Sequence, residues 1–431
     1  MKKIFIWSKK PPFERFSEKQ IIVEDLLERN VGNLLFRTAA ARTLMMDVHQ
    51  AFYTKRDVLP DLNDAWIERI NSECAFMALP LANAFRAAYM GQLEFITRLI
   101  EKLKIPCVVM GVGIQCDSID SLRDGFSFDG TVRRFIKAVL DHSAKLGLRG
   151  EFTAQYLEHL GFVRDRHFQV IGCPSMFSFG AELPQIRLGE IGPNSHVCNN
   201  TKPAASANIH AFMQRSCAAL PDYTYIPQTT QELCMLNLGA LLPGKKSGGG
   251  EYNYFPTSRS SSLLRDGRVA ELFDANAWID YMRGFELSYG CNIHGNIAAL
   301  LAGVPAVVIG RDLRVMEIAN YFEIPCVAPD ALEGKQILDL LDGLDFSGMN
   351  RGHAQRFERY VDFLKANGIE NIYALPEAPS PMPFDRRMAE CGVQPPLQPP
   401  KRLDFERRML GFRVTQRALC AAMRRRFRRE R

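Results

Sequence analysis

Residues 285–317 read FELSYGCNIHGNIAALLAGVPAVVIGRDLRVME, and this stretch alternates short apolar runs with small-residue segments of helical spacing. Residues 285–290 and 305–310 are typical of strands, because each run is short, apolar and closed by a glycine. Residues 295–303 and 315–323 are predicted helices. Strands that alternate with helices predict a parallel sheet with helices packed on its faces.

The same alternation runs through the rest of the chain. Further strands are predicted at residues 2–7, 106–115, 146–150, 168–177, 223–228 and 325–329. Further helices are predicted at residues 22–30, 30–46, 93–105, 131–146, 151–162, 231–242, 278–284, 331–342 and 350–366. The Gly-, Pro-, Asn- and Ser-rich stretch 178–205 reads as a linker. The pattern therefore predicts an α/β fold with two Rossmann-like domains that face a cleft.

The predicted domain boundaries follow from these composition changes. Residues 1–185 are predicted to form an N-terminal Rossmann-like domain, and residues 186–375 a C-terminal one. A Pro-rich linker covers 376–400, and a basic tail covers 401–431. The loop 243–262 is rich in Gly and Ser and is expected to be flexible.

The composition is that of a soluble globular protein, with 47% apolar and 24% charged residues. Its longest apolar run, residues 297–310, is too short to span a membrane. The apolar core of the basic start, residues 4–7, is too short for a secretory signal, so we expect a cytoplasmic protein. The 11 cysteines contain no C-x-x-C pair, which disfavours a zinc or redox motif.

Basic charge is concentrated in the tail. Residues 401–431 hold twelve Lys and Arg against three Asp and Glu, so the tail carries +9 and the rest of the chain carries 6 − 9 = −3. Apolar side chains recur on one side of the predicted tail helix, at Met409, Phe412, Leu419, Met423 and Phe427. A basic amphipathic helix favours an anionic membrane surface. The alternatives are a tail packed on the body and a solvated charge run; nucleic acid is not an expected partner.

Ligands of open α/β sheets bind beyond the carboxyl ends of the strands. Five segments of the chain fall at such places: NVGN (30–33), GVGIQ (111–115), LRGE (148–151), GCPS (172–175) and residues 289–317. The last segment has the most specific chemistry. A helix that starts near His294 or Gly295 offers unpaired N–H groups to an anion, and Arg311 and Arg314 after the next strand would point at the same anion. Glu317 lies three residues beyond Arg314, where it could orient that side chain.

Each of these residues also has a purely structural interpretation. His294 could be a hydrogen-bonded helix-start residue, and Arg149 a surface charge. Asn30, Gly32, Asn33 and Ser175 could be turn or cap residues. GVGIQ has no third glycine and is a poor dinucleotide fingerprint. Cys173 of GCPS has no histidine nearby in sequence and reads as structural.

The motifs taken together resemble those of the polysaccharide pyruvyl transferase family. The resemblance covers about residues 25–370 and is carried by NVGNLLFRTAAARTL, GVGIQ, LGLRGEFTAQYLEHLG and GCPSMF, and above all by IHGNIAALLAGVPAVVIGRDLRVMEIANYFEIP. It implies a GT-B-like fold and transfer of the enolpyruvyl unit of phosphoenolpyruvate to a sugar, with a ketal formed and phosphate released. The expected acceptor is a cell-surface polysaccharide or its lipid-linked precursor, with residues 1–185 as the expected acceptor side and residues 186–375 as the expected donor side.

The resemblance also implies roles for individual residues. His294 would be the general acid, or a partner of the donor phosphate, and its pKa is expected near the working pH. Arg149 and Arg314 would hold the donor anion, with Glu317 as orienter of Arg314. Asn30, Gly32, Asn33 and Ser175 are the other expected site residues, in turns that would meet acceptor or donor.

One position departs from the family pattern. The arginine expected two residues before the histidine is Asn292, which would weaken the anion site or shift its duty to Arg311. Two other interpretations therefore stay open: a GT-B glycosyltransferase with a nucleotide-sugar donor, and an inactive scaffold on the inner membrane. The sequence has no metal-binding motif and no P-loop, so we expect no metal and no cofactor, with phosphoenolpyruvate as co-substrate.

Overall fold

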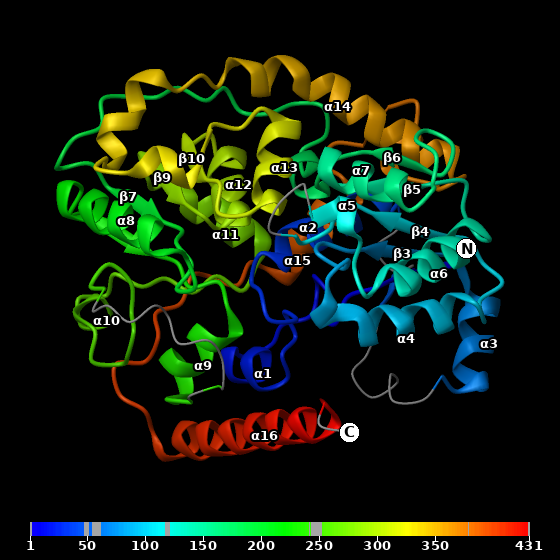
Figure 1. Ribbon diagram of the computed structural model, residues 1–431, viewed down its shortest axis with the longest axis horizontal. Coiled ribbons are helices and arrows are strands. Elements are labelled where there is room, and N and C mark those ends of the chain that lie inside the picture. The colour runs from blue at the N-terminus through cyan, green and yellow to red at the C-terminus, as the bar shows by residue number, and fades with distance from the viewer. Residues whose placement is uncertain are drawn as a thin grey trace.

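The computed structural model describes residues 2–46, 51–53, 62–116, 121–240, 242, 252–377 and 379–429 (Figure 1). Its strands are β1 (Lys3–Ile6), β2 (Ala51–Tyr53), β3 (Cys74–Pro80), β4 (Cys107–Met110), β5 (Leu146–Leu148), β6 (Phe168–Val170), β7 (Val197–Asn199), β8 (Tyr223–Tyr225), β9 (Leu287–Gly290), β10 (Ala306–Ile309) and β11 (Cys326–Val327). Every paired strand is parallel to its neighbour.

The helices alternate with these strands. They are α1 (Glu18–Val23), α2 (Asn33–Leu44), α3 (Asp64–Glu73), α4 (Met90–Ile100), α5 (Ser121–Asp124), α6 (Asp129–Leu140), α7 (Glu151–His159), α8 (Ala207–Ala219), α9 (Thr230–Leu238), α10 (Ser262–Arg265), α11 (Ala275–Met282), α12 (Ile293–Leu301), α13 (Leu313–Phe322), α14 (Ser347–Ala366), α15 (Pro383–Cys391) and α16 (Phe405–Arg429).

Two parallel sheets organise the molecule. The first has the order β2-β1-β3-β4, and a bridge between Val112 and Leu148 continues it to the pair β5-β6. The second has the order β11-β10-β9-β7-β8. Helices cover both sheets, and the two α/β halves lie side by side (Figure 1). The predicted fold class, α/β with parallel sheets in two Rossmann-like halves, is confirmed.

Side-chain packing joins the halves into one body. One apolar cluster includes Val108 and Met110 of β4 together with Val308 of β10, so its buried surface is continuous between the sheets. Helix α14 returns from the second half to the first, where Tyr360 stacks on Phe177 with ring centroids 5.0 Å apart. Burial of apolar surface across both halves stabilises their packing through the hydrophobic effect.

Several segments differ from their sequence-based prediction. The predicted helix 22–30 ends at Val23, because Asp25, Glu28 and Arg29 adopt positive φ values of 49°, 49° and 72° and turn the chain. The predicted linker 178–205 contains β7, and the predicted Pro-rich linker contains α15. Part of the predicted loop 243–262 lies outside the described residues.

Candidate functional site

A cavity of about 310 Å³ lies between the two halves, at the carboxyl ends of the strands. Backbone contacts across the halves close one side of it. Val31 donates its N–H to the carbonyl of Gln228 at 2.9 Å, and Asn30 forms a bridge with Thr229. The position agrees with the rule that open parallel sheets bind ligands beyond the ends of their strands.

Six basic side chains line this cavity, against one acidic side chain. The basic residues are Arg29, Arg37, Arg86, Arg149, Lys202 and Arg314. The acidic residue, Glu28, is ion-paired with Arg37. The uncompensated positive charge gives the cavity an electrostatic preference for anions.

Arg149 enters the cavity directly from the end of β5. The residue is 2% exposed, its N–H donates to the carbonyl of Val112, and its Nε donates to the carbonyl of Gly111 at 3.3 Å. Its side chain lies on Gly113, where a Cβ would be 2.3 Å from Cδ of Arg149. Gly113 of GVGIQ thus makes room for an arginine side chain.

His294 lies in the first turn of α12 and forms another part of the cavity wall. Its ring is 5.7 Å from that of Phe36, and a Cβ on Gly32 would lie 2.6 Å from its Nδ1. Burial, followed by the positive charges of Arg149 and Arg314, lowers the pKa of His294 to about 3. The imidazole is therefore neutral near pH 7, whereas the sequence favours a pKa near the working pH.

Arg314 reaches the cavity from the first turn of α13, and Asp312 caps that helix by accepting the N–H of Val315 at 3.1 Å. Asp312 contacts Arg311 at 2.6 Å and Arg314 at 3.4 Å. Burial alone would raise the pKa of Asp312, but the two arginines lower it. Arg311 is not among the residues that line the cavity. Its position therefore does not favour the predicted role as an anion ligand.

Glu317 has different partners from the predicted one. Its carboxylate oxygens accept hydrogen bonds from the N–H and the hydroxyl of Thr153, in the first turn of α7, at 3.0–3.1 Å. Among the described residues, the carboxylate that contacts Arg314 is that of Asp312, so Glu317 connects the two halves instead of orienting Arg314. Burial raises the pKa of Glu317 to about 7, although Arg149 opposes this shift.

The remaining predicted residues fall into two groups. Asn30, Asn33 and Asn292 line the cavity. Their side chains also serve the local backbone: Oδ1 of Asn30 accepts the N–H of Gly32 at 2.8 Å, Nδ2 of Asn33 donates to Leu27 at 2.8 Å, and Nδ2 of Asn292 donates to Thr201 at 3.2 Å.

Gly295 and Ser175 lie behind the cavity wall. A Cβ on Gly295 would be 2.0 Å from Oδ1 of Asn200, so the glycine lets α12 pack closely on the sheet. Ser175 is fully buried, and its hydroxyl is 3.2 Å from Sγ of Cys173.

Four of the six cavity cations are not among the residues predicted from the sequence: Arg29, Arg37, Arg86 and Lys202. Arg86 follows β3, its guanidinium lies 5.8 Å from the ring centroid of Tyr89, and burial together with Arg314 lowers its pKa. Lys202 follows β7, inside the predicted linker, and burial, Arg311 and Arg314 lower its pKa to about 8. The only available signal was their place after a strand, and β7 itself is too short to be recognised.

Two cavity arginines have N–H groups that are available for hydrogen bonds to a ligand. Among the described residues, the Nε atoms of Arg86 and Arg314 are buried and have no hydrogen-bond partner. Buried donors without a partner are costly, and an anion that accepts from them removes that cost. The described part of the chain contains no group of three or more His, Cys, Asp and Glu residues placed to hold a metal ion.

Comparison with solved structures gives only distant likenesses. Anabaena HepE, solved with UDP and glucose, is 11% identical; the match covers 98% of this chain and 100% of that one, with a TM-score of 0.40. MnaA of S. aureus, solved with UDP, is 12% identical, with 88% and 99% covered and a TM-score of 0.40. An uncharacterised Klebsiella pneumoniae protein is 12% identical, with 74% and 88% covered and a TM-score of 0.37. Sequence identities and TM-scores this low do not indicate a function for this chain.

Sequence comparison is more informative. No curated protein sequence matches the chain. The family model for polysaccharide pyruvyl transferase matches residues 81–312, which is more than half of the 431 residues and includes Arg86, Arg149, Lys202 and His294. The chain belongs to the polysaccharide pyruvyl transferase family.

Proposed function

We propose that the cavity binds phosphoenolpyruvate and that the protein transfers its pyruvyl unit to two hydroxyls of a saccharide, with release of phosphate. The observation that carries this proposal is the set of six basic side chains against one paired carboxylate around His294. Phosphoenolpyruvate brings a phosphate and a carboxylate on a three-carbon frame, and it supplies the transferred group itself, so the reaction needs no cofactor.

The positions of the charged side chains support different binding roles for the individual cations. Arg149 and Arg314 are the two groups that act electrostatically on His294, so they are the proposed ligands of the donor phosphate. Lys202 lines the cavity beside Asn292 and is the proposed replacement for the arginine that position 292 lacks. The anion site then does not depend on Arg311.

The lowered pKa of His294 fits a proton donor that carries a positive charge only when phosphoenolpyruvate is bound. A phosphate dianion between Arg149 and Arg314 offsets the two charges that, after burial, lower the pKa of the imidazole. The imidazolium that then forms gives its proton to C3 of phosphoenolpyruvate, which becomes a methyl group.

The other bonds that form and break in the reaction are those of C2 of phosphoenolpyruvate. The oxygen of one saccharide hydroxyl bonds to C2 and releases its proton, which restores the proton lost by His294. The oxygen of a second hydroxyl then bonds to C2 while the C2–O bond to phosphate breaks, and its proton leaves with the phosphate. The products are a cyclic pyruvate ketal and inorganic phosphate.

Isotope transfer tests this chemistry. Phosphoenolpyruvate labelled with ¹³C at C3 is incubated in D₂O with the protein and the glycan fraction of its own cells. The expected product is a saccharide-bound methyl group with one deuterium, absent with His294→Ala. If the label stays in phosphoenolpyruvate while a nucleotide sugar is consumed, the glycosyltransferase alternative replaces the proposal.

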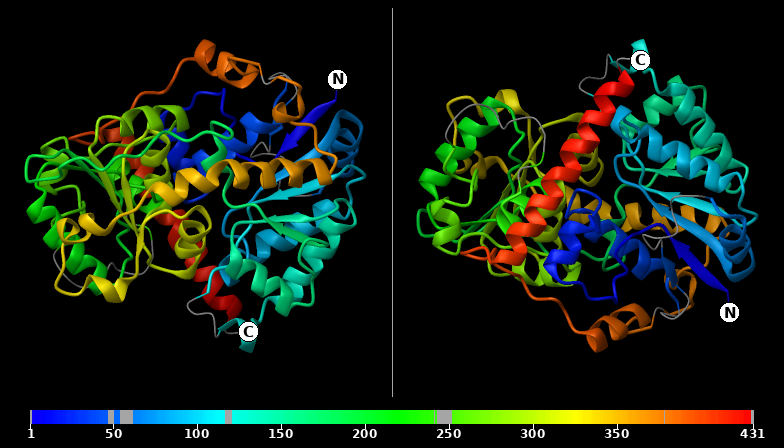
Figure 2. Two further views of the ribbon diagram at one scale, coloured as in Figure 1. Left: turned by 90° about the horizontal axis from the view of Figure 1, so that it is seen from above. Right: turned by 90° about the horizontal axis from the view of Figure 1, so that it is seen from below.

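We also propose that the acceptor is a surface polysaccharide or its lipid-linked precursor, and that the protein works at the cytoplasmic face of the inner membrane. No helix in the described part of the chain combines the length and apolarity needed to cross a bilayer. The proposal is supported by the two faces of α16, which lies across the outside of the body (Figure 2).

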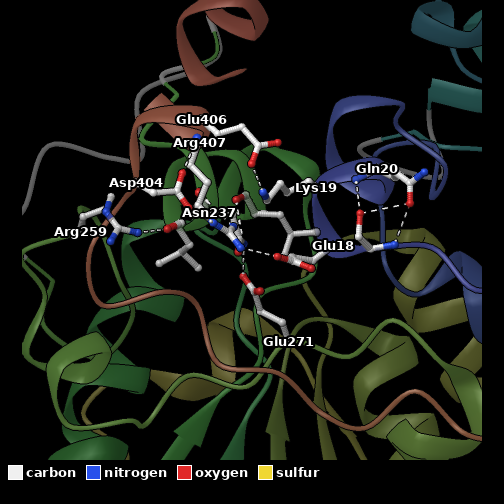
Figure 3. Close-up of polar contacts among 12 residues, drawn as sticks. Glu18, Lys19, Gln20, Asn237, Arg259, Glu271, Asp404, Glu406 and Arg407 are labelled. Atoms are coloured by element: carbon white, nitrogen blue, oxygen red, sulfur yellow. Dashed lines mark hydrogen bonds and ion pairs between the residues drawn. The ribbon is translucent and has the colours of Figure 1, made fainter. Parts of the chain in front are cut away.

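One face of α16 is fixed to the body. Glu406 and Arg407 form ion pairs with Lys19 and Glu18 of α1, as Figure 3 shows. Gly411 is buried against Leu238 at the end of α9, where a Cβ would be 2.1 Å from the carbonyl oxygen. The helix therefore does pack on the body, as one of the sequence-based alternatives held.

The opposite face of α16 is apolar and uncovered. Its exposed side chains are Phe405 (79% exposed), Met409 (39%), Phe412 (58%), Leu419 (48%) and Met423 (53%). Arg408, Arg413 and Arg417 are exposed beside them, whereas the side chain of Phe427 lies outside the described residues. An apolar row flanked by arginines matches the boundary of an anionic bilayer, where each basic side chain near the surface contributes about 1 kcal/mol.

Vesicle sedimentation tests this surface with the full-length protein. We expect binding to phosphatidylglycerol vesicles, weaker binding at high salt, and none to phosphatidylcholine vesicles. Arg413→Glu with Arg417→Glu, and Phe412→Ser with Met423→Ser, should each release the protein. Val163→Ser, at a position that is 51% exposed elsewhere, is the matched control and should change nothing. Equal binding by the control and the α16 variants, or no binding at all, would contradict the proposal.

A further inference from the structure

A buried sulfur lies directly behind the cavity histidine. Sγ of Cys173 is 3.8 Å from Nε2 of His294 and 3.2 Å from the hydroxyl oxygen of Ser175. Cys173 is 2% exposed and Ser175 is fully buried. These three side chains form a continuous polar chain from the interior to the imidazole. The residues come from the segment after β6 and from the first turn of α12, which are 121 positions apart.

The backbone around Cys173 is well determined by its neighbours. Gly172 precedes it with a φ of +76°, a conformation that favours glycine, and a Cβ there would be 2.4 Å from the ring of Phe322. Pro174 follows it and begins the 3-10 helix η4 (Pro174–Phe177). Ser178 donates its hydroxyl hydrogen to the carbonyl of Ser175 at 2.6 Å. The sulfur is therefore held in place by a fixed turn, which is a requirement for orienting a second side chain.

We infer that Cys173 is a positioning residue that holds the imidazole of His294 with Nε2 toward sulfur, so that Nδ1, beside Gly32, is the nitrogen that serves the substrate. This inference rests on the proposed function. The sulfur accepts the Nε2–H hydrogen bond, and the hydroxyl of Ser175 donates to the sulfur from the other side. Nδ1 then accepts a proton when the donor anion arrives and gives it to C3 of phosphoenolpyruvate.

The location of Cys173 distinguishes this role from that of a nucleophile. The residue is not among those that line the cavity, and the imidazole stands between its sulfur and the cavity space. A thiolate attack on C2 of the donor would need direct access. A partner that fixes the tautomer of a catalytic histidine acts from behind the ring, as the carboxylate of a serine-protease triad does.

The first test reads the histidine tautomer and does not depend on any reaction. Full-length protein with ¹⁵N-labelled histidine is compared by NMR with Cys173→Ala and Cys173→Ser, and His294→Gln identifies the signal. We expect the Nε2–H form of His294 in the native protein, a mixture of tautomers in Cys173→Ala, and the native form in Cys173→Ser, whose hydroxyl keeps a partner for Nε2. Cys74→Ala removes a thiol that is 1% exposed, at the start of β3, and should leave the His294 signal unchanged.

The second test measures the steady-state kinetics of the reaction. If the isotope transfer occurs, Cys173→Ala should lower kcat by about tenfold or more with little change in the KM for phosphoenolpyruvate, and should shift the pH profile, while Cys173→Ser recovers most of the activity. An unchanged tautomer in Cys173→Ala would overturn the inference, whatever the activity. A changed tautomer in a protein that transfers nothing would instead count against the proposed function.

Discussion

Replacing Gly113 by alanine adds one methyl group beneath the arginine that the account places on the donor phosphate. The new Cβ would lie 2.3 Å from Cδ, 2.9 Å from Cγ and 2.7 Å from Nε of Arg149. Arg149 is 2% exposed and its backbone N–H is bonded to Val112, so the side chain has little room in which to yield. We expect it to leave its position.

The magnitude has two parts. Overpacking of a buried site costs about 1–3 kcal/mol of unfolding free energy. A charge-assisted hydrogen bond to the ligand contributes about 1.5–3 kcal/mol, so its loss weakens phosphoenolpyruvate binding by roughly 10- to 150-fold. Titration calorimetry measures the binding, and urea unfolding measures the stability.

A double-mutant cycle with Arg149→Ala isolates the cause. If Gly113 acts only by making room for Arg149, then Gly113→Ala has no further effect on donor affinity once Arg149 is alanine. Gly91→Ala is the matched control, because no atom lies within 4 Å of its Cβ position in α4; it should keep native affinity and be slightly more stable. Native affinity in a folded Gly113→Ala protein, or additive losses in the cycle, would refute the reasoning.

Three further predictions concern protons and the tail. The pKa of Glu317 is raised by burial from 4.5 to about 7, so the fold favours the protonated carboxyl, and the contribution of Glu317 to the unfolding free energy should fall as the pH rises from about 4.5 to about 7. Glu317→Gln should reduce the difference in unfolding free energy between pH 5 and pH 8, measured by urea unfolding. Because the pKa of His294 is lowered to about 3, binding of sulfate, which is already a dianion at pH 6, should take up a proton, seen by calorimetry in two buffers of different ionisation enthalpy; uptake that persists in His294→Asn would contradict this. Arg407→Ala removes the ion pair with Glu18 and should raise hydrogen exchange in α16, while Arg387→Ala, whose pair with Glu390 is exposed, should not.

The fold was predictable because its signals are local. Apolar runs closed by glycine, such as the strand before Gly111 and the one before Gly310, are visible in a single sequence. The misassigned segments depend on backbone conformation that composition does not encode. Residues 24–30 have the apolar spacing of a helix, but three positive φ values turn them into the wall of the cavity. β7 has only three residues in a polar, Gly-rich context.

Only part of the site was predictable from strand ends, because Arg86 and Lys202 also follow strands and are not among the predicted residues. His294, Arg149 and Arg314 each follow a strand and meet in one cavity. Cys173 was interpreted as structural because its histidine is distant in sequence, and only the fold brings the two side chains to 3.8 Å. Glu317 was assigned to Arg314 by helical spacing, whereas packing of α13 against α7 gives it to Thr153. Contacts between elements decide such partners, and spacing within one element cannot.

Calorimetric titration of the full-length protein with phosphoenolpyruvate, beside UDP and inorganic phosphate, tests the central claim most directly. We predict one bound phosphoenolpyruvate per chain, with affinity lost at least tenfold in Arg149→Ala and in Arg314→Ala and unchanged in Arg283→Ala, an exposed arginine of the half that contains Arg314. Tight binding of UDP with no binding of phosphoenolpyruvate would contradict it.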